Sequence, residues 1–202
     1  MVQIVLPHTK TLLALAVIAV SLILSDAYAQ SNASGTFTDT RDGKTYRTVK
    51  IGKATWMAEN LNFKTERSVC YKNDESNCKK YGRLYDWDDA VKACPAGWHL
   101  SAREEWNDLV EAAGGNAAGT KLKSKTSWNG TDDLGFSATP GGRSGTDGNF
   151  DNAGLFGFWW SAAEFEFGES SAWRRYMGSG FTYVIENTDR KDRRLSARCV
   201  EN

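Results

Sequence analysis

This sequence of 202 residues has few histidines and prolines and no net charge. It contains two histidines and three prolines, and 25 lysines and arginines balance 25 aspartates and glutamates. A protein that follows phosphate backbones needs a basic surface to displace counterions, so we expect no nucleic-acid partner. His99 is the single histidine after residue 29. A Ser-His-Asp or Cys-His arrangement would therefore have to be built on this one side chain.

The N-terminal region has the layout of a signal peptide. Lys10 precedes an uninterrupted small and apolar run over residues 11–24, and Ala-Tyr-Ala at 27–29 supplies a cleavage site. The run is shorter than the about 20 residues that a spanning helix needs. We expect residues 1–29 to be removed, leaving a mature chain that begins at Gln30, has no membrane span, and is secreted, periplasmic or at the cell surface. An uncleaved membrane anchor is the alternative.

Beyond the cleavage site, the composition predicts one domain. Residues 30–38 begin with small polar side chains and are expected to form a flexible leader. Residues 39–202 contain no proline-rich, serine-rich or charged tract that could be a linker, and no repeat of fixed period. A chain of this length can bury about 68–70% of its unfolded surface in one core.

Four cysteines, at positions 70, 78, 94 and 199, belong to a chain that we expect in an oxidising compartment. An even number in that setting favours disulfides, and three pairings are open. The spacing favours Cys70 with Cys78, which bracket a polar loop, and Cys94 with Cys199, at a helix end and in the final strand. A zinc site is the alternative, although the sequence has no Cys-x-x-Cys spacing.

Local patterns predict a hairpin and two helices. Residues 45–51 alternate and are followed by a Gly-Lys turn and residues 54–57, as in a β-hairpin. A helix capped by Asp86 should end at Cys94, because Pro95 forbids continuation. A second helix should begin with a capping box of Ser101 and Glu104 and end at residues 114–115. The apolar faces of the two helices are expected at Leu84, Trp87, Val91 and Cys94, and at Trp106, Leu109, Val110 and Ala113.

The remaining segments are expected to be loops and antiparallel strands. Residues 70–80 should form a surface loop, and the part that follows residue 114 should be rich in loops because glycine replaces helical periodicity there. Strands are expected over residues 158–165, 171–177, 181–185 and 195–200, the last two joined by a charged turn at 187–192. The order of elements predicts an α+β fold.

Several motifs occur in the order found in one bacterial family. They are IGK at 51–53, WMAENL at 56–61, YGRLYDW at 81–87, CPAGWHL at 94–100, GFSA at 135–138, PGG at 140–142, FWWS at 158–161 and ARCV at 197–200. Together they resemble the Fibrobacter succinogenes major paralogous domain over about residues 39–202. The resemblance implies a bacterial secreted or surface protein without an established activity.

The resemblance also implies a fold. The helix, the cysteine and the Gly-x-His-Leu sequence are similar to C-type-lectin-like and formylglycine-generating-enzyme-like domains, in which a helix-borne cysteine bonds to one in the last strand. This similarity implies the pairing of Cys94 with Cys199. An oxidase activity of the formylglycine-generating type would need a reactive cysteine pair near the C-terminus, where this sequence has Cys199 alone. His99 is expected to be packed or hydrogen-bonded between its two helices.

Residues 147–152 resemble the start of a calcium loop. Asp147, Asn149 and Asp151 offer oxygen ligands at alternate positions. An EF-hand is excluded, because Asn152 stands where that loop needs glycine and Phe158 where it needs glutamate. An irregular calcium site and a polar turn are the two interpretations.

Aromatic residues are the candidates for ligand binding. Eight tryptophans are many for a core of this size, and rings crowd residues 159–176. Strand alternation places Trp160 and Glu164 on the face opposite Trp159 and Phe165, so at least one tryptophan could reach the surface unless both faces are covered. The predicted ligand-binding residues are Trp160, Glu164, Trp173, Arg174 and Tyr176. The alternative is that these rings fill the core.

These observations favour a non-catalytic binding or adhesion module, secreted or displayed at the surface, for a glycan or a surface protein. Exposed rings can stack on sugars or anchor a protein partner. An enzyme of the formylglycine-generating or hydrolase type and a structural protein of the cell envelope are the alternatives. No cofactor is expected apart from the calcium ion considered above.

Overall fold

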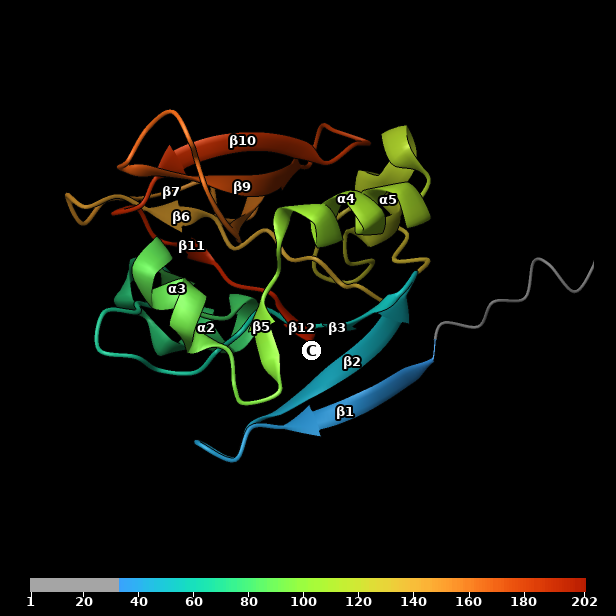
Figure 1. Ribbon diagram of the computed structural model, residues 1–202, viewed down its shortest axis with the longest axis horizontal. Helices are drawn as coiled ribbons and strands as arrows, with labels where there is room; N and C mark the ends of the chain where they lie inside the picture. The colour runs from blue at the N-terminus through green and yellow to red at the C-terminus, as the bar shows by residue number, and fades with distance from the viewer. Residues whose placement is uncertain (1–32) are drawn as a thin grey trace, which may run out of the picture. The chain divides into compact units, whose positions relative to one another are not determined.

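The structure is a computed structural model that describes residues 33–202 (Figure 1). The predicted signal peptide lies outside the described residues. Within residues 33–202 there are four α-helices, two five-stranded sheets and one two-stranded sheet. This arrangement confirms the predicted α+β class.

The first sheet combines strands from both ends of the described chain with one strand, β5 (Trp98–Leu100), from its middle. Its strands, in spatial order, are β1 (Ser34–Thr38), β2 (Thr45–Ile51), β3 (Ala54–Met57), β12 (Cys199–Glu201) and β5. β2 and β3 form the predicted hairpin, and Val49 and Ile51 turn their side chains into the core. Within the segment expected as a flexible leader, residues 34–38 instead form β1, which pairs along its whole length with β2; residues 30–32 of that segment lie outside the described residues.

The second sheet is built mainly from the C-terminal half. Its order is β10 (Ile185–Arg190), β9 (Ser171–Gly178), β8 (Phe156–Glu164), β11 (Leu195–Ser196) and β4 (Leu84–Tyr85). β8 and β9 match the strands expected there. The two-stranded sheet consists of β6 (Arg143–Ser144) and β7 (Phe150–Asp151).

Strand β10 corrects two expectations. Residues 187–192 were expected to be a charged turn, but most of them belong to strand β10. Residues 181–185 were expected to be a strand, but all except Ile185 precede β10. The charges of β10 are satisfied by tertiary contacts: Glu186 pairs with Arg175 of β9 and with Arg103, and Asp189 pairs with Arg174. Ion pairs of this kind let an acidic segment form an edge strand despite its low intrinsic β-propensity.

The helices are α2 (Glu75–Tyr81), α3 (Trp87–Ala93), α4 (Arg103–Ala112) and α5 (Ala118–Leu122), with short 3₁₀ turns η1 (Tyr71–Asn73) and η2 (Gly115–Ala117). Among residues 33–202, no helix combines the length and the apolar character that crossing a membrane requires.

Helix α3 begins and ends as the sequence predicts. The Asp86 side chain accepts a hydrogen bond from the backbone N–H of Asp89, and Cys94 ends the helix before Pro95. Its buried face is made by Trp87, Ala90 and Ala93. Val91 is exposed, and Leu84 precedes the helix in β4, so the predicted apolar face was wrong at these two positions.

Helix α4 has the predicted buried face but a different cap. The carboxylate of Glu105, not Glu104, accepts a hydrogen bond from the backbone N–H of Ala102 at 2.7 Å. Ala102 is the N-cap and offers no side-chain acceptor, so the expected capping box at Ser101 is shifted by one residue and is only half formed. At the other end, left-handed Gly114 follows the helix as expected.

Two short helices were not predicted. The segment 70–80 was expected to be a surface loop, but it contains η1 and α2, and Cys78 and Tyr81 of α2 are buried. Asp74 caps α2 by accepting from the backbone N–H of Ser76. The part of the chain after residue 114 includes α5, which packs against α4. Each helix is short, so neither carries an extended apolar periodicity.

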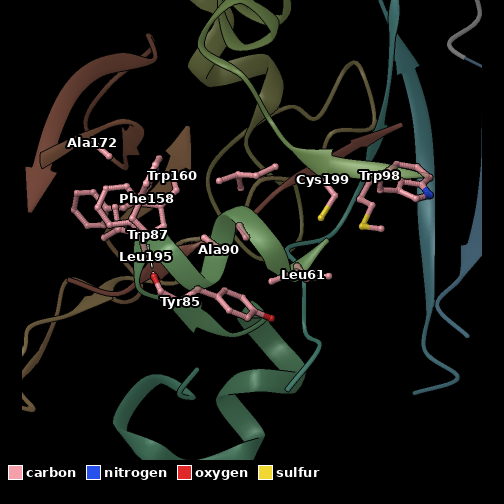
Figure 2. Close-up of a cluster of buried hydrophobic side chains, with 14 of the residues drawn as sticks. Leu61, Tyr85, Trp87, Ala90, Trp98, Phe158, Trp160, Ala172, Leu195 and Cys199 are labelled. Carbon is pink, nitrogen blue, oxygen red and sulfur yellow. Dashed lines mark hydrogen bonds between the residues drawn. The ribbon is translucent and has the colours of Figure 1, made fainter. Parts of the chain in front are cut away.

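Strand β8 lies between two hydrophobic clusters and is covered on both faces. Phe158 and Trp160 belong to a cluster with Trp87 of α3 (Figure 2), whereas Trp159 packs against Trp106 of α4. Trp159 and Trp160 are both 0% exposed. The alternation predicted for this strand is therefore present, but neither of the two rings reaches the surface.

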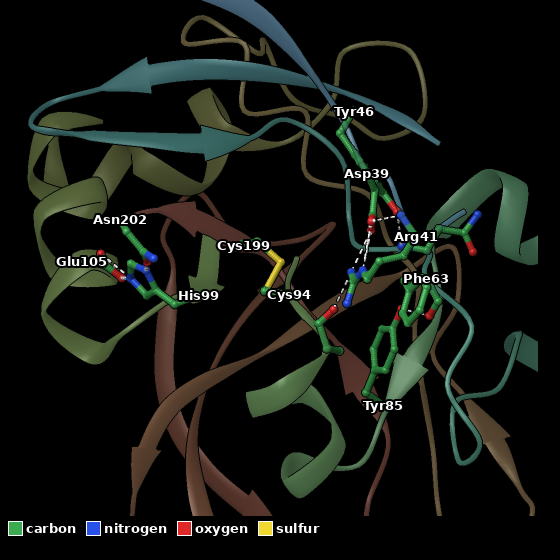
Figure 3. The surroundings of a disulfide bond; sticks show 12 residues. Asp39, Arg41, Tyr46, Phe63, Tyr85, Cys94, His99, Glu105, Cys199 and Asn202 are labelled. Carbon is green, nitrogen blue, oxygen red and sulfur yellow. Dashed lines mark hydrogen bonds and ion pairs between the residues drawn. A yellow bond between two sulfur atoms is a disulfide. The ribbon is translucent and has the colours of Figure 1, made fainter. Parts of the chain in front are cut away.

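Two disulfides connect the predicted partners. Cys70 is bonded to Cys78 and Cys94 to Cys199, and the second bond joins the end of α3 to the last strand (Figure 3). Beside it, Arg41 forms a salt bridge with Asp39 and donates to the backbone oxygen of Ala93. Hydrogen bonds from Arg41 lower the pKa of the Asp39 carboxyl below its usual value. These contacts attach the turn between β1 and β2 to the C-terminal end of α3.

Candidate functional site

Trp160 is a core residue. Its indole N–H donates to the backbone oxygen of Tyr85 at 2.8 Å, and Figure 2 shows its ring among buried side chains. A ring with no exposed surface cannot stack on a ligand without local unfolding. Trp160 therefore offers no exposed ring to a ligand, because α3 covers this face of the sheet.

The other four predicted residues lie on different parts of the second sheet. Glu164 is exposed and pairs with Lys191 at 2.9 Å. Trp173 is half-buried between Arg103 and Phe165, on one face of β9. Arg174 and Tyr176 lie on the other face of β9, where the guanidinium of Arg174 stacks on the ring of Tyr176 at 4.7 Å. Strand alternation thus separates these side chains, and they do not form one pocket.

The three predicted calcium ligands make contacts within the protein. The carboxylate of Asp147 accepts hydrogen bonds from the backbone and the side-chain amide of Asn149, and Asp151 forms a salt bridge with Arg143 at 3.0 Å. All three residues are exposed. These contacts are those of a polar turn, which was the alternative interpretation of the segment.

His99 is hydrogen-bonded on both sides of its ring (Figure 3). Its Nδ1 lies 2.7 Å from Oδ1 of Asn202 and its Nε2 lies 2.9 Å from Oε1 of Glu105. Among the described residues, no serine, threonine or cysteine side chain forms a hydrogen bond with the ring. His99 therefore connects the chain end to the start of α4, as expected for a hydrogen-bonded ring between two helices.

A cavity of about 630 Å³ lies elsewhere, between the β2–β3 hairpin, helix α2 and residues 124–139. Its lining is predominantly polar. The lining residues are Lys44, Thr45, Tyr46, Arg47, Ala58, Glu59, Asn60, Asn62, Cys78, Lys79, Lys80, Tyr81, Gly82, Ser124, Thr126, Ser127, Asp132, Ser137 and Thr139. We refer to it as the hairpin cavity.

Asn60 links the hairpin cavity to the core. Its Oδ1 accepts hydrogen bonds from the indole of Trp159 at 2.7 Å and from the guanidinium of Arg198 at 2.9 Å. Its Nδ2 donates to the backbone oxygen of Tyr81 at 2.8 Å. Because every side-chain atom that can form a hydrogen bond is engaged, the Asn60 amide is held in one orientation.

Gly82 lies against Asn60, and no other residue fits there. Its backbone has φ 77° and ψ −175°, a region that is essentially restricted to glycine. A Cβ atom at this position would lie 2.7 Å from Cβ of Asn60 and 2.9 Å from the backbone oxygen of Leu61. The glycine therefore lets the end of α2 approach the segment that follows β3.

Arg198 is a fully buried cation on the core side of Asn60. Its guanidinium donates to the backbone oxygens of Met57 and Phe136 and to Asn60, and it lies 4.2 Å from the centre of the Phe136 ring. No carboxylate among residues 33–202 contacts it. Burial lowers the pKa of Arg198 to about 9, which leaves it protonated at neutral pH. Its positive charge is thus not neutralised by a partner.

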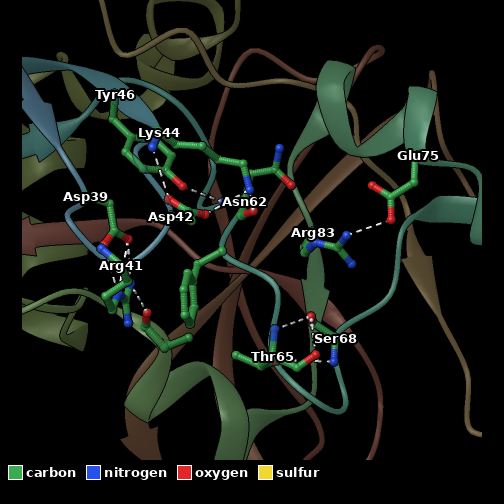
Figure 4. A network of polar contacts seen from close by, with 12 residues as sticks. Asp39, Arg41, Asp42, Lys44, Tyr46, Asn62, Thr65, Ser68, Glu75 and Arg83 are labelled. Carbon is green, nitrogen blue, oxygen red and sulfur yellow. Dashed lines mark hydrogen bonds and ion pairs between the residues drawn. The ribbon is translucent and has the colours of Figure 1, made fainter.

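One wall of the hairpin cavity combines Lys44, Tyr46 and Asn62 (Figure 4). The hydroxyl of Tyr46 accepts a hydrogen bond from the backbone N–H of Asn62, and Lys44 donates to the backbone oxygen of Asn62. Burial raises the pKa of Tyr46 to about 12, so its hydroxyl keeps its proton at neutral pH and can donate it. Oδ1 of Asn62 is shielded from solvent and accepts no hydrogen bond from the described residues.

Another part of the lining contains two residues in an unusual conformation. Asp132 and Ser137 are not glycines, yet each has φ near +53°. The Asp132 carboxylate accepts hydrogen bonds from the backbone N–H and the hydroxyl of Ser137, at 2.7 and 2.6 Å. Non-glycine residues in the left-handed region often accompany functional sites, and here both line the same cavity.

Comparison with protein families assigns the chain. The family model of the Fibrobacter succinogenes major domain matches residues 49–201, which is well over half of the sequence. The chain belongs to this family. Comparisons with curated proteins and with solved structures find no match.

Most of the hairpin cavity lies within the Fibrobacter succinogenes major domain. The motifs WMAENL, YGRLYDW and GFSA supply Asn60, Gly82 and Ser137 to it, whereas Lys44 and Tyr46 precede the matched region. Sequence reasoning missed this site because its residues come from segments far apart in the chain. The available signal was the polar residues inside otherwise apolar motifs, of which Asn60 is the clearest.

Proposed function

We propose that this protein is an exported, non-catalytic binding module of C-type-lectin-like fold that holds a glycan in the hairpin cavity. The observation that carries the proposal is the polar lining of this cavity. It contains the hydroxyls of Thr45, Ser124, Thr126, Ser127, Ser137 and Thr139, the amides of Asn60 and Asn62, and the rings of Tyr46 and Tyr81. Few ligands other than saccharides offer hydroxyls around most of their surface.

The lining offers both hydrogen-bond donors and hydrogen-bond acceptors to the hydroxyls of a polyhydroxylated ligand. Tyr46 can donate its hydroxyl proton, and the exposed hydroxyl of Thr126 can accept a hydrogen bond from the ligand. Pockets that combine a few oriented polar groups with some apolar surface are typical of small-molecule sites.

A hydrolase is the second candidate, because Glu59 and Asp132 line the same cavity. Glycoside hydrolysis needs two carboxyl groups facing one bond. Against it, Glu59 accepts hydrogen bonds from Arg47 and Asp132 accepts two from Ser137, so both carboxylates are committed to the protein. The four cysteines form two disulfides, so an oxidase of the formylglycine-generating type would have no free thiol.

The proposed location and fold have independent support. The two disulfides fit an oxidising compartment, and export by the predicted signal peptide would bring the chain to such a compartment. The bond from the end of α3 to the last strand agrees with the C-type-lectin-like arrangement. N-terminal sequencing of the exported protein should give Gln30 as the first residue, and retention of residues 1–29 would argue for a membrane anchor instead.

The test of the proposed function is binding of the exported protein to an array of glycans and surface polymers, with and without calcium. Thr126→Trp should abolish binding, because Thr126 is exposed at the cavity and a bulky ring would occlude it. Thr40→Trp is the matched control, since Thr40 is also exposed but does not line the cavity. Binding that survives Thr126→Trp, or turnover of a bound glycan that Glu59→Gln abolishes, would contradict the proposal.

A further inference from the structure

The charges around the hairpin cavity are unequal. Four basic side chains line it, Lys44, Arg47, Lys79 and Lys80, against two acidic ones, Glu59 and Asp132. Arg47 is paired with Glu59, and Lys44 is paired with Asp42 at 2.9 Å. With Asp42 included, four basic side chains stand against three acidic ones, so the cavity has an excess of one positive charge.

Lys79 and Lys80 have no acidic partner. The ammonium groups of both are exposed, and neither forms an ion pair or a hydrogen bond with a side chain of residues 33–202. Nζ of Lys80 lies 4.8 Å from the centre of the Tyr81 ring, which itself lines the cavity. Their place in the last turn of α2 is favourable for a helix dipole. The helix dipole explains why positive side chains are favourable at this end of α2, but it does not explain why they line the cavity.

The buried Arg198 adds a third positive charge beneath the same cavity. Its guanidinium is separated from the cavity by Asn60, to which it donates at 2.9 Å. Among the charged groups, Glu59 and Asp132 of the cavity stabilise the positive charge of Arg198 and Arg47 opposes it. Charge held in a low-dielectric surrounding is weakly screened, so Arg198 adds to the attraction of Lys79 and Lys80 for an anion.

We propose that the ligand of the hairpin cavity is an anionic saccharide, whose acid group faces Lys79 and Lys80 while its hydroxyls contact Tyr46 and Thr126. This inference rests on the proposed function and narrows it to a class of ligand. A carboxylate and a sulfate group would satisfy the lysines equally, because an ammonium group acts as a point charge without a preferred planar partner. A neutral saccharide would leave Lys79 and Lys80 without a counter-charge.

The test compares saccharides that share a sugar backbone and differ in charge. The probes are a galacturonan oligomer and its methyl ester, and dextran sulfate and dextran, each titrated against the exported protein. We expect the charged member of a pair to bind about tenfold more tightly, which corresponds to about 1.4 kcal/mol, and the difference to shrink as salt is added.

Two double variants test whether Lys79 and Lys80 cause the preference for the charged probes. Lys79→Gln with Lys80→Gln should abolish the preference for the charged probe. Lys64→Gln with Lys92→Gln is the control, because it also removes two exposed lysines but neither lines the cavity, and Lys92 likewise lies in the last turn of a helix. Both variants should keep the wild-type melting temperature, which is measured first.

The outcomes separate this inference from the proposed function. A charge preference that disappears in the first variant and persists in the second supports the anionic ligand. Equal or tighter binding of the neutral probes, a charge preference that Lys79→Gln with Lys80→Gln leaves unchanged, or no binding of any charged probe would overturn it. If neutral glycans on the array still bind in a way that Thr126→Trp abolishes, the proposed function stands and only the anionic class fails.

Discussion

The two disulfides should differ in what they do for the protein. The bond between Cys70 and Cys78 spans 8 residues, and the bond between Cys94 and Cys199 spans 105. In the chain-entropy account, closing loops of these lengths destabilises the unfolded state by about 2.5 and about 4.8 kcal/mol. Replacing each pair by alanine should therefore cost about 2 kcal/mol more stability for the long loop than for the short one.

Packing should not obscure this difference. Cys70, Cys78 and Cys199 are buried and Cys94 is half-buried, so each double substitution removes sulfur atoms from a similar setting. Urea unfolding of the two variants measures the free energies directly, and melting temperatures should differ by roughly 4–9 °C at this chain length. The m-values should be compared as well, because a changed slope would reveal a changed unfolded state.

Ligand binding should follow the opposite order. Cys78 lines the hairpin cavity and its disulfide fixes the start of the segment that carries α2. The variant that lacks the short bond should lose more affinity for glycan at a temperature where both variants are folded. An equal or larger stability loss for the short loop would refute the entropic reasoning, and unchanged affinity would refute the role assigned to α2.

Three further substitutions test the core, the cavity and an ion pair. Trp160→Ala should cost roughly 3–5 kcal/mol in urea unfolding, whereas Phe167→Ala, at an 88% exposed ring, should change stability by less than about 0.5 kcal/mol. Gly82→Ala should cost roughly 1–3 kcal/mol from backbone strain alone and should reduce glycan binding, since its Cβ would displace the backbone at the cavity; wild-type binding and stability would contradict this. Hydrogen bonds from Arg103 lower the pKa of Glu186 below its ordinary value of 4.5, so this ion pair stabilises the fold above that pH and is lost as the pH falls through the lowered pKa. Glu186→Gln should therefore lower stability at neutral pH and flatten the acid side of the pH–stability curve, and an unchanged curve would be inconsistent with the pair.

The sequence predicted those elements whose limits are set by local chemistry. The cap at Asp86 and the stop at Pro95 define α3, and the Gly-Lys turn defines the β2–β3 hairpin. The disulfide partners followed from the spacing of four cysteines and from the family resemblance. Each of these signals acts within a few residues or is covalent, so it does not depend on the rest of the fold.

Elements that depend on distant partners could not be predicted. Strand β10 is acidic and was expected to turn, but arginines from β9 and α4 neutralise it. Predicting that Trp160 is buried would require knowing that both faces of β8 are covered, by α3 on one side and α4 on the other. Alternation along one strand gives the face of a side chain but not what covers that face.

The base and the rim of the hairpin cavity serve different purposes. Its base is formed by groups that also hold the core together: Asn60 binds the indole of Trp159 and the guanidinium of Arg198, and Gly82 allows the close approach of α2. Changes there should alter folding and binding together. The rim includes exposed side chains, such as Lys79, Lys80 and Thr126, none of which forms an ion pair with a described residue. Ligand specificity can therefore change at the rim without loss of the fold, which is why rim substitutions are the ones that can separate binding from stability.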